Sequence, residues 1–178
     1  MKRRFNQAAP LLLIVITSGH AAELDPKTLA SVKAFLASYV KAINIGSGEL
    51  LTFYNDTALI HVTVTAQNRK TQTREISGLD WKRMLGDKMA SGKATLEPEE
   101  LHTVRIQGNG QNLEIAAQRY SSTRCYWDMN YRLVITPDGT GRYQILNESL
   151  FIDHNNQCPP PETLTLKQAI RINQNPLP

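Results

Sequence analysis

Two polar side chains in the second half of the chain could do chemistry in a pocket. His102 is a candidate general base, and Arg119 is a candidate partner for a carboxylate group. A predicted hairpin turning at Asn109 and Gly110 places both on its apolar side. The alternative is that both stand at strand ends with their heads in water, where Glu100 pairs with Arg119. We favour this alternative, because polar residues near strand ends are common and pockets are few.

Aromatic and amide side chains extend the set of candidate pocket residues. An aromatic stripe is usually part of a core, and in this chain it could also form the apolar wall of a cavity. The stripe consists of Trp127, Tyr131, Tyr143 and Phe151. The complete set of ligand-pocket candidates is Tyr54, His102, Arg119, Trp127, Tyr131 and Asn147. These residue types do not by themselves identify a catalytic residue.

Several well-defined chemistries lack their sequence signature. The chain contains no serine nucleophile elbow, phosphate-binding glycine loop, paired-histidine metal motif or nucleic-acid-binding module. We therefore predict no metal and no cofactor. The net charge of +4 comes largely from the N-terminus, where Lys2, Arg3 and Arg4 are three of the 20 basic residues and none of the 16 acidic ones is found. The rest of the chain has a net charge of +1, which does not indicate a nucleic-acid partner.

The N-terminus has the order of residues typical of a secretory signal peptide. Basic residues come first, an apolar run follows from Ala8 to Ile16, and small and polar residues end at Ala22. The apolar run is shorter than the roughly 20 residues of a membrane-spanning helix, so a membrane anchor is the less favoured alternative. We predict that residues 1–22 are a signal peptide cleaved near Ala21 or Ala22, and that the protein is periplasmic or secreted.

The two cysteines, Cys125 and Cys158, both follow the signal. In an oxidising compartment such a pair most simply forms a disulfide. Metal binding is the alternative, and it is not favoured because no further cysteine stands at ligand spacing. Closing a loop of this length would stabilise the fold by roughly 3 to 4 kcal/mol in the chain-entropy account. The bridge would also tether a proline-rich tail, residues 159–178, to the preceding domain, residues 23–158.

Local signals predict three helices in the first half of the chain. Asp25 and Pro26 suit an N-cap and a first helical position, and an apolar stripe at three- and four-residue steps then runs to Gly46. A short helix is predicted over residues 48–54. A further helix starts at Ser77 and Gly78. The first of these helices has the most complete set of signals.

Alternation of apolar and polar residues predicts strands in the rest of the chain. A strand is expected over residues 58–65, and the polar stretch 67–75 fits either a loop or an exposed hairpin. Two later hairpins turn at residues 109–110 and 137–141. Residues 164–172 fit a short helix or a strand.

The register of the second hairpin assigns its side chains to two faces. Trp127, Tyr131 and Asn147 fall on a largely apolar and aromatic face. Asp128 and Glu148 fall on the opposite, polar face. The strands are therefore expected to be half-buried, most economically against the helices.

This order of elements resembles the cone-shaped α+β fold of the nuclear-transport-factor-2-like and ketosteroid-isomerase-like superfamily. The likeness is clearest from Leu51 to Leu85, where FYNDTALI leads from a helix into the first strand and SGLDWKRML opens a glycine-led helix. The closing stretch, YRLVITPDGTGRYQILNESLFI, is similar to the last two strands of such proteins. The resemblance covers residues 26–154 and implies one domain, with a curved antiparallel sheet wrapped around N-terminal helices to leave a conical cavity.

Proteins with this fold include isomerases, dehydratases, hydrolases and binding proteins, so the resemblance does not settle function. The enzymes place an acid or a Tyr/Asp pair deep in the cone, and we match no such pair here. We therefore expect an exported, non-enzymatic binding or accessory protein acting on a protein partner or a small ligand, for example in immunity, secretion or the cell envelope. The alternative is a cofactor-free enzyme of isomerase, dehydratase or hydrolase type. Either is compatible with a homodimer.

Overall fold

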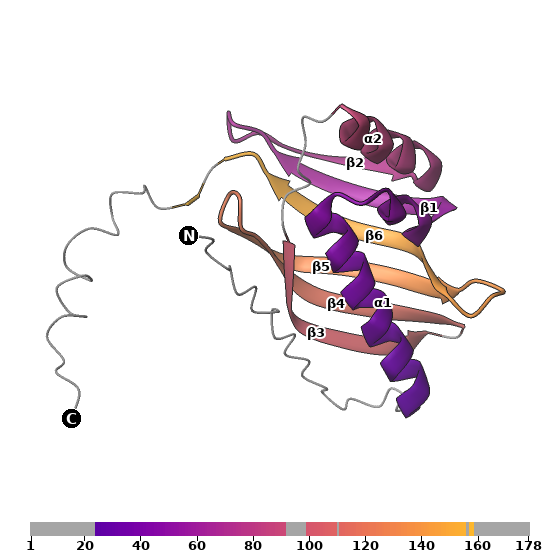
Figure 1. Ribbon diagram of the computed structural model, residues 1–178. Helices are drawn as coiled ribbons and strands as arrows, with labels where there is room; N and C mark the ends of the chain where they lie inside the picture. The colour runs from indigo at the N-terminus through magenta and orange to yellow at the C-terminus, as the bar shows by residue number, and fades with distance from the viewer. Residues whose placement is uncertain (1–23, 92–98, 110, 156, 159–178) are drawn as a thin grey trace, which may run out of the picture.

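The computed structural model of the chain describes residues 24–91, 99–109, 111–155 and 157–158 (Figure 1). Helices come first in this part of the chain, and antiparallel strands fill its second half. The elements are α1 Pro26–Ile45, η1 Gly48–Phe53 (a 3-10 helix), β1 Tyr54–Thr65, β2 Thr71–Ser77, α2 Gly78–Ala90, β3 Glu99–Asn109, β4 Asn112–Ser121, β5 Tyr126–Pro137 and β6 Tyr143–Asp153. Neither described helix has the length and apolar character needed to cross a membrane.

The strands of these ranges form one curved six-stranded sheet in the order β2-β1-β6-β5-β4-β3 (Figure 1). Neighbouring strands pair antiparallel, except that β1 and β6 run parallel. A parallel pair needs a long connection, and here nearly all of the domain lies between its two strands. The predicted cone-like α+β fold is confirmed, with a sheet that is mixed and not wholly antiparallel.

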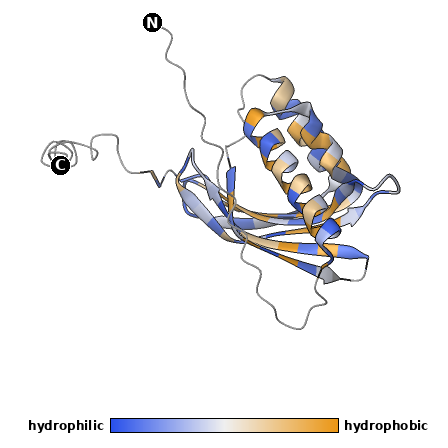
Figure 2. Cartoon of the chain, turned by 60° about the horizontal axis from the view of Figure 1, so that its bottom comes forward, coloured by the Kyte–Doolittle hydropathy of each residue, from blue (hydrophilic) through white to orange (hydrophobic). Residues whose placement is uncertain are grey.

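Both α-helices lie over the same face of the sheet, as Figure 2 shows with the sheet seen nearly edge-on. The hydrophobic core fills the space between the two layers. Its fully buried side chains come from α1 and from the inner face of the strands, and include Leu36, Tyr39, Ile60, Ile115, Leu133 and Ile145. We call the face toward the helices the inner face of the sheet and the opposite one the outer face.

Helix α1 begins and ends where the sequence predicts. The Asp25 side chain accepts hydrogen bonds of 3.0 Å from the backbone N–H groups of Lys27 and Thr28, and Pro26 takes the first helical position. At the other end, Gly46 has a left-handed backbone with φ of 62°, which glycine adopts without a steric cost. These caps fix the length of the helix that crosses the sheet.

A β-bulge in β3 changes the side on which His102 lies. Thr103 and Val104 together stand opposite Ala117 of β4, and Thr103 has a positive φ of 50°. The prediction that His102 lies on the apolar side of the hairpin is therefore wrong, and His102 pairs with Gln118. The turn also lies one residue later than predicted, because Asn109 pairs with Asn112. Its ring lies on the outer face against Trp127, with ring centroids 5.1 Å apart.

Two further bulges reverse the predicted faces in β5 before Met129 and in β6 after Leu146. In β5, Met129 and Asn130 together stand opposite Gln118 of β4, so that Asp128 and Tyr131 both point inward. In β6, Leu146 is an extra residue, so that Ile145 and Glu148 both point inward. The predictions that Trp127 lies on the apolar inner face and that Asp128 and Glu148 lie on the polar face are wrong. Trp127 is 44% exposed, whereas Glu148 is 2% exposed.

The structure tests the predicted disulfide and the predicted hairpin, but not the predicted signal and tail. Cys125 and Cys158 form the predicted disulfide, which joins the start of β5 to the segment after β6. The stretch 67–75 is resolved in favour of the hairpin, because β2 pairs with β1. The predicted signal (1–22) and tail (159–178) lie outside the described residues.

Gly78 is the point at which α2 is fixed against the sheet. A Cβ atom on Gly78 would lie 2.0 Å from the backbone oxygen of Asn55 and 2.9 Å from the Cβ of Ala58. Neither atom belongs to a side chain that can swing away. The helix therefore approaches β1 more closely than any residue larger than glycine permits.

We expect the Gly78→Ala substitution to lower the free energy of unfolding by about 1 to 3 kcal/mol, since the backbone must move to relieve the overlap. Gly86→Ala is the matched control in the same helix, where the nearest atom to an added Cβ is 3.8 Å away. That control should be neutral or should stabilise the protein by up to about 1 kcal/mol. Urea unfolding of both variants checks this, and equal effects at the two positions would contradict it.

Candidate functional site

A cavity of about 170 Å³ lies between the helices and the inner face of the sheet. Its apolar wall consists of Ile43, Leu50, Leu85, Tyr126, Leu150 and Ile152. Its polar lining consists of Tyr39, Tyr54, Trp81, Lys88, Glu99, Arg119, Arg124, Glu148 and His154. A cavity of roughly 150 Å³ accommodates benzene, so this one is large enough for a ligand of about one ring.

Glu148 is the polar centre of this cavity. Its Oε1 atom accepts hydrogen bonds from the Tyr39 hydroxyl at 2.9 Å and the Tyr131 hydroxyl at 2.8 Å. Its Oε2 atom accepts one hydrogen bond, from the Tyr54 hydroxyl at 2.7 Å. We call these four side chains the Glu148 cluster. It joins α1, β1, β5 and β6 through a single carboxyl group.

Burial controls the protonation of the Glu148 cluster. Desolvation raises the pKa of Glu148 above its ordinary value, although hydrogen bonds from the tyrosine hydroxyls and the charge of Arg119 act in the opposite direction. Desolvation and the nearby Glu148 charge also raise the pKa of Tyr39, Tyr54 and Tyr131 well above the ordinary value. The three phenols therefore keep their protons and act as donors at neutral pH.

Arg119 lies beside this cluster and is almost completely buried, at 3% exposure. Its guanidinium donates hydrogen bonds to the Glu99 carboxylate and to the backbone oxygen of Phe151, and its Nε atom lies 3.6 Å from Oδ2 of Asp128. Its Cζ atom lies 5.4 Å from the ring centroid of Tyr131. Burial is the largest influence and alone would lower the pKa of Arg119, but its interactions with Glu99, Tyr126, Tyr131 and Asp128 together raise the pKa, so the group stays charged.

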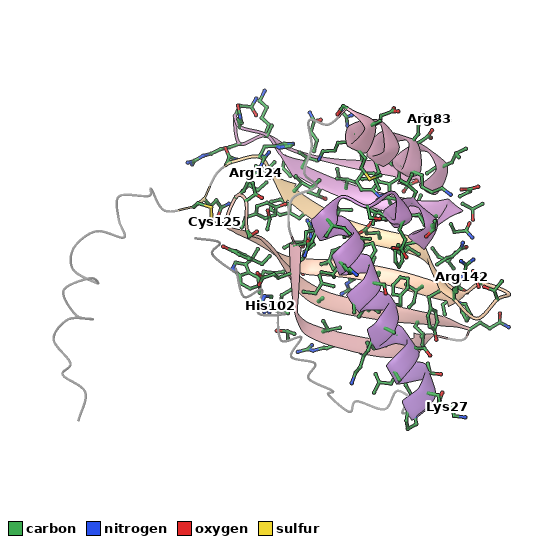
Figure 3. The ribbon with its side chains drawn as sticks, viewed as in Figure 1. Lys27, Arg83, His102, Arg124, Cys125 and Arg142 are labelled. Atoms are coloured by element: carbon green, nitrogen blue, oxygen red, sulfur yellow. A yellow bond between two sulfur atoms is a disulfide. The ribbon has the colours of Figure 1, made fainter. Side chains whose placement is uncertain are left out.

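Arg124 and His154 line the cavity close to the disulfide. Arg124 lies beside Cys125 at the end of the sheet where β5 begins (Figure 3). Its Nη1 atom is 2.8 Å from Nδ1 of His154. A guanidinium only donates, so in this contact Nδ1 of His154 is the acceptor. Because His154 is exposed, we place the opening of the cavity at this end.

The structure separates the six predicted pocket residues into two groups. Tyr54 and Arg119 line the cavity, and Tyr131 belongs to the Glu148 cluster. His102, Trp127 and Asn147 do not line it. The favoured alternative, with Arg119 and His102 both in water, is wrong for the buried Arg119; Arg119 pairs with Glu99, whereas Glu100 lies 3.1 Å from His102.

Sequence reasoning did not select Glu148, Tyr39 or Trp81 as candidate site residues. Tyr39 and Trp81 follow the apolar spacing of their helices, a pattern that most core aromatic residues share and that therefore does not indicate a site. Regular alternation predicts Glu148 on the polar face, because the extra residue Leu146 leaves no local signal in the sequence. A glutamate within a largely apolar strand was the available hint.

The site can hold a hydrogen-bonding group and an apolar body together. An ionised carboxylate offers about four lone-pair positions, and the tyrosine hydroxyls take three of them. The free position is on Oε2 of Glu148. Within the described ranges, no group of His, Cys, Asp and Glu side chains is arranged to hold a metal ion.

We expect the stability of the protein to depend on the protonation of Glu148. Because the pKa of Glu148 is raised in the folded state, its contribution to the free energy of unfolding is complete at acid pH and is lost as the pH rises through that pKa. The Glu148→Gln variant cannot titrate there. The wild type should therefore lose stability relative to the variant as the pH rises, as measured by urea unfolding from acidic to alkaline pH. A difference that does not change with pH would contradict this.

Solved structures with low sequence identity share the fold of this chain. No protein-family model and no curated protein matches the sequence. A nuclear-transport-factor-2-like protein of unknown function from Pseudomonas putida KT2440 has 14% identity and a TM-score of 0.51, over 68% of this chain and 85% of that one. A protein of unknown function with a cystatin-like fold from Nostoc punctiforme PCC 73102 has 8% identity and a TM-score of 0.51, over 76% of this chain and 98% of that one. The chain therefore has the α+β fold of the nuclear-transport-factor-2-like superfamily, as the order of its elements predicts.

Proposed function

We propose that this protein is an exported, non-enzymatic binding protein whose cavity takes a small ligand. The cavity between the helices and the sheet, with an apolar wall and the Glu148 cluster among its polar groups, carries this proposal. Small-ligand sites typically combine such a wall with a few directed polar groups. Of the two kinds of target expected from the sequence, a protein partner or a small ligand, this geometry favours the small ligand.

Export is the second part of the proposal. The predicted signal at residues 1–22 motivates it, and the disulfide between Cys125 and Cys158 is consistent with an oxidising compartment. We propose that the protein works in the periplasm or outside the cell. Sequencing the N-terminus of the protein from its own cell envelope tests this, since cleavage near Ala21 or Ala22 is expected.

Native mass spectrometry of the protein purified from its own cell envelope tests the ligand-binding proposal. We expect a retained small molecule in the wild type and its loss in Leu85→Phe, because the larger side chain fills part of the cavity. Leu79→Phe is the matched control, since Leu79 is an exposed residue of the same helix. A protein partner at fixed stoichiometry with no small molecule would contradict the proposal, and so would a ligand that Leu85→Phe retains in full.

A cofactor-free enzyme is the second candidate, and one observation favours it. Burial raises the pKa of Glu148 while one position on its Oε2 atom stays free, which suits a general acid or base. Tyr54 and Tyr131 converge on the same carboxyl group, as a cone-pocket enzyme requires. His102 takes no part in this arrangement, because it lies on the outer face.

Incubation of the protein with its retained ligand in deuterium oxide separates the two candidates. As a binding protein, it should leave the ligand chemically unchanged and without new deuterium, as read by NMR and mass spectrometry. Exchange or conversion by the wild type that is lost in Glu148→Gln, while that variant still binds the ligand, would replace the binding proposal with the enzymatic one.

A further inference from the structure

The indole N–H of Trp81 is a buried donor on the cavity wall. Its Nε1 atom makes no hydrogen bond of good geometry in the described part of the chain, although the indole lies close enough to the Tyr54 hydroxyl to act against the rise of the Tyr54 pKa. The nearest aromatic neighbour is Tyr54, whose ring stands edge-on to the indole with centroids 6.4 Å apart. A buried donor without an acceptor costs about 1 to 3 kcal/mol, so this position is suited to an acceptor from a ligand.

The free position on Glu148 lies beside the same tyrosine. The Tyr54 hydroxyl is 2.7 Å from Oε2, which accepts no other hydrogen bond from the described residues, whereas Oε1 accepts two. The Tyr54 side chain therefore lies between the indole N–H of Trp81 and Oε2 of Glu148, and each of these two atoms can take a further hydrogen bond. One ligand group that both accepts and donates could serve both.

Size and apolarity define the rest of the ligand. The cavity of about 170 Å³ is several times the roughly 30 Å³ occupied by one water molecule, so it has room for a ligand of several heavy atoms that displaces water. Leu50, Leu85, Leu150 and Ile152 offer an apolar wall to the ligand body. The volume of the cavity suits a single ring or an aliphatic group of similar size.

We propose that the cavity selects a small, neutral hydroxyl compound, whose oxygen accepts from Nε1 of Trp81 and whose hydrogen is directed to Oε2 of Glu148. This inference rests on the proposed ligand-binding function and names the chemical class of its ligand. A hydroxyl fits because its hydrogen can rotate to donate to a carboxylate, or its oxygen can accept from a protonated carboxyl group.

Other ligand groups fit these two positions less well. A ligand carboxylate at these two positions would stand beside Glu148 and Glu99 and would offer no hydrogen to Oε2 of an ionised Glu148. It would pair instead with the cationic lining, which consists of Lys88, Arg124 and Arg119, whose Nε has no hydrogen-bond partner in the described residues. An ammonium group offers no acceptor to Trp81. An ether accepts from Trp81 but gives nothing to an ionised Glu148. Trp81 and Glu148 together therefore favour a hydroxyl over a carboxylate, an ammonium group or an ether at these two positions.

Three one-ring compounds test this selection: phenol donates and accepts, anisole only accepts, and toluene does neither. NMR titration of the full chain should give phenol at least about tenfold tighter binding than toluene or anisole, in line with hydrogen bonds to a buried carboxylate. Trp81→Phe should reduce the preference for phenol over toluene by about fivefold. Trp127→Phe on the outer face is the matched control and should leave it unchanged.

A second variant keeps the test independent of any loss of packing at Trp81. Glu148→Gln places an amide donor near Tyr54 in place of an acceptor, so it should reduce the preference for phenol over anisole by about tenfold. Equal binding of all three compounds would overturn the hydroxyl inference while leaving a ligand cavity in place. A phenol preference that both variants retain would also overturn it. Binding of none of the three would count against the proposed ligand-binding function itself.

Discussion

The buried carboxyl group of Glu148 is the interaction on which the arrangement of the other elements depends. Moving a carboxyl group out of water is costly unless hydrogen bonds replace its hydration, and here three phenol hydroxyls do so. The donors come from α1, β1 and β5, and the acceptor from β6. The helix layer and the centre of the sheet are therefore held in one position by a shared polar contact, in addition to the apolar core.

The parts of the fold that the sequence predicts are those with local signals. Asp25, Pro26 and Gly46 mark the ends of α1 because capping is decided by the residues at the cap. The inward alternation of Ala58, Ile60 and Val62 predicts the face of β1, since that stretch has no bulge. The order of these elements was then enough to indicate the cone-like fold, because few architectures accommodate it.

The parts of the fold that the sequence could not predict depend on single extra residues in the strands. Bulges at Thr103, at Met129 with Asn130, and at Leu146 each break the two-residue alternation once. Every side chain beyond such a point changes face, which is why His102 and Trp127 are outside and Glu148 is inside. The pairing strand determines where the extra residue sits, so a strand read alone does not contain this information. The hairpin predicts the face of Arg119, because no bulge interrupts β4 itself. It does not predict that the guanidinium is buried, which depends on the pairing with Glu99.

The cost of this polar interior is an argument that the cavity is used. Apolar side chains of similar volume in place of the Glu148 cluster and of the buried ions Arg119, Glu99 and Asp128 would in general give an equally or more stable core. A protein that only needed a core would gain nothing from a carboxyl oxygen and an indole N–H left incompletely bonded beside a space the size of one ring. Such groups instead reduce the desolvation cost for a ligand that completes their hydrogen bonds. Because one fold can serve both binding proteins and enzymes, it is this local arrangement, and not the cone, that supports the proposal of a bound ligand.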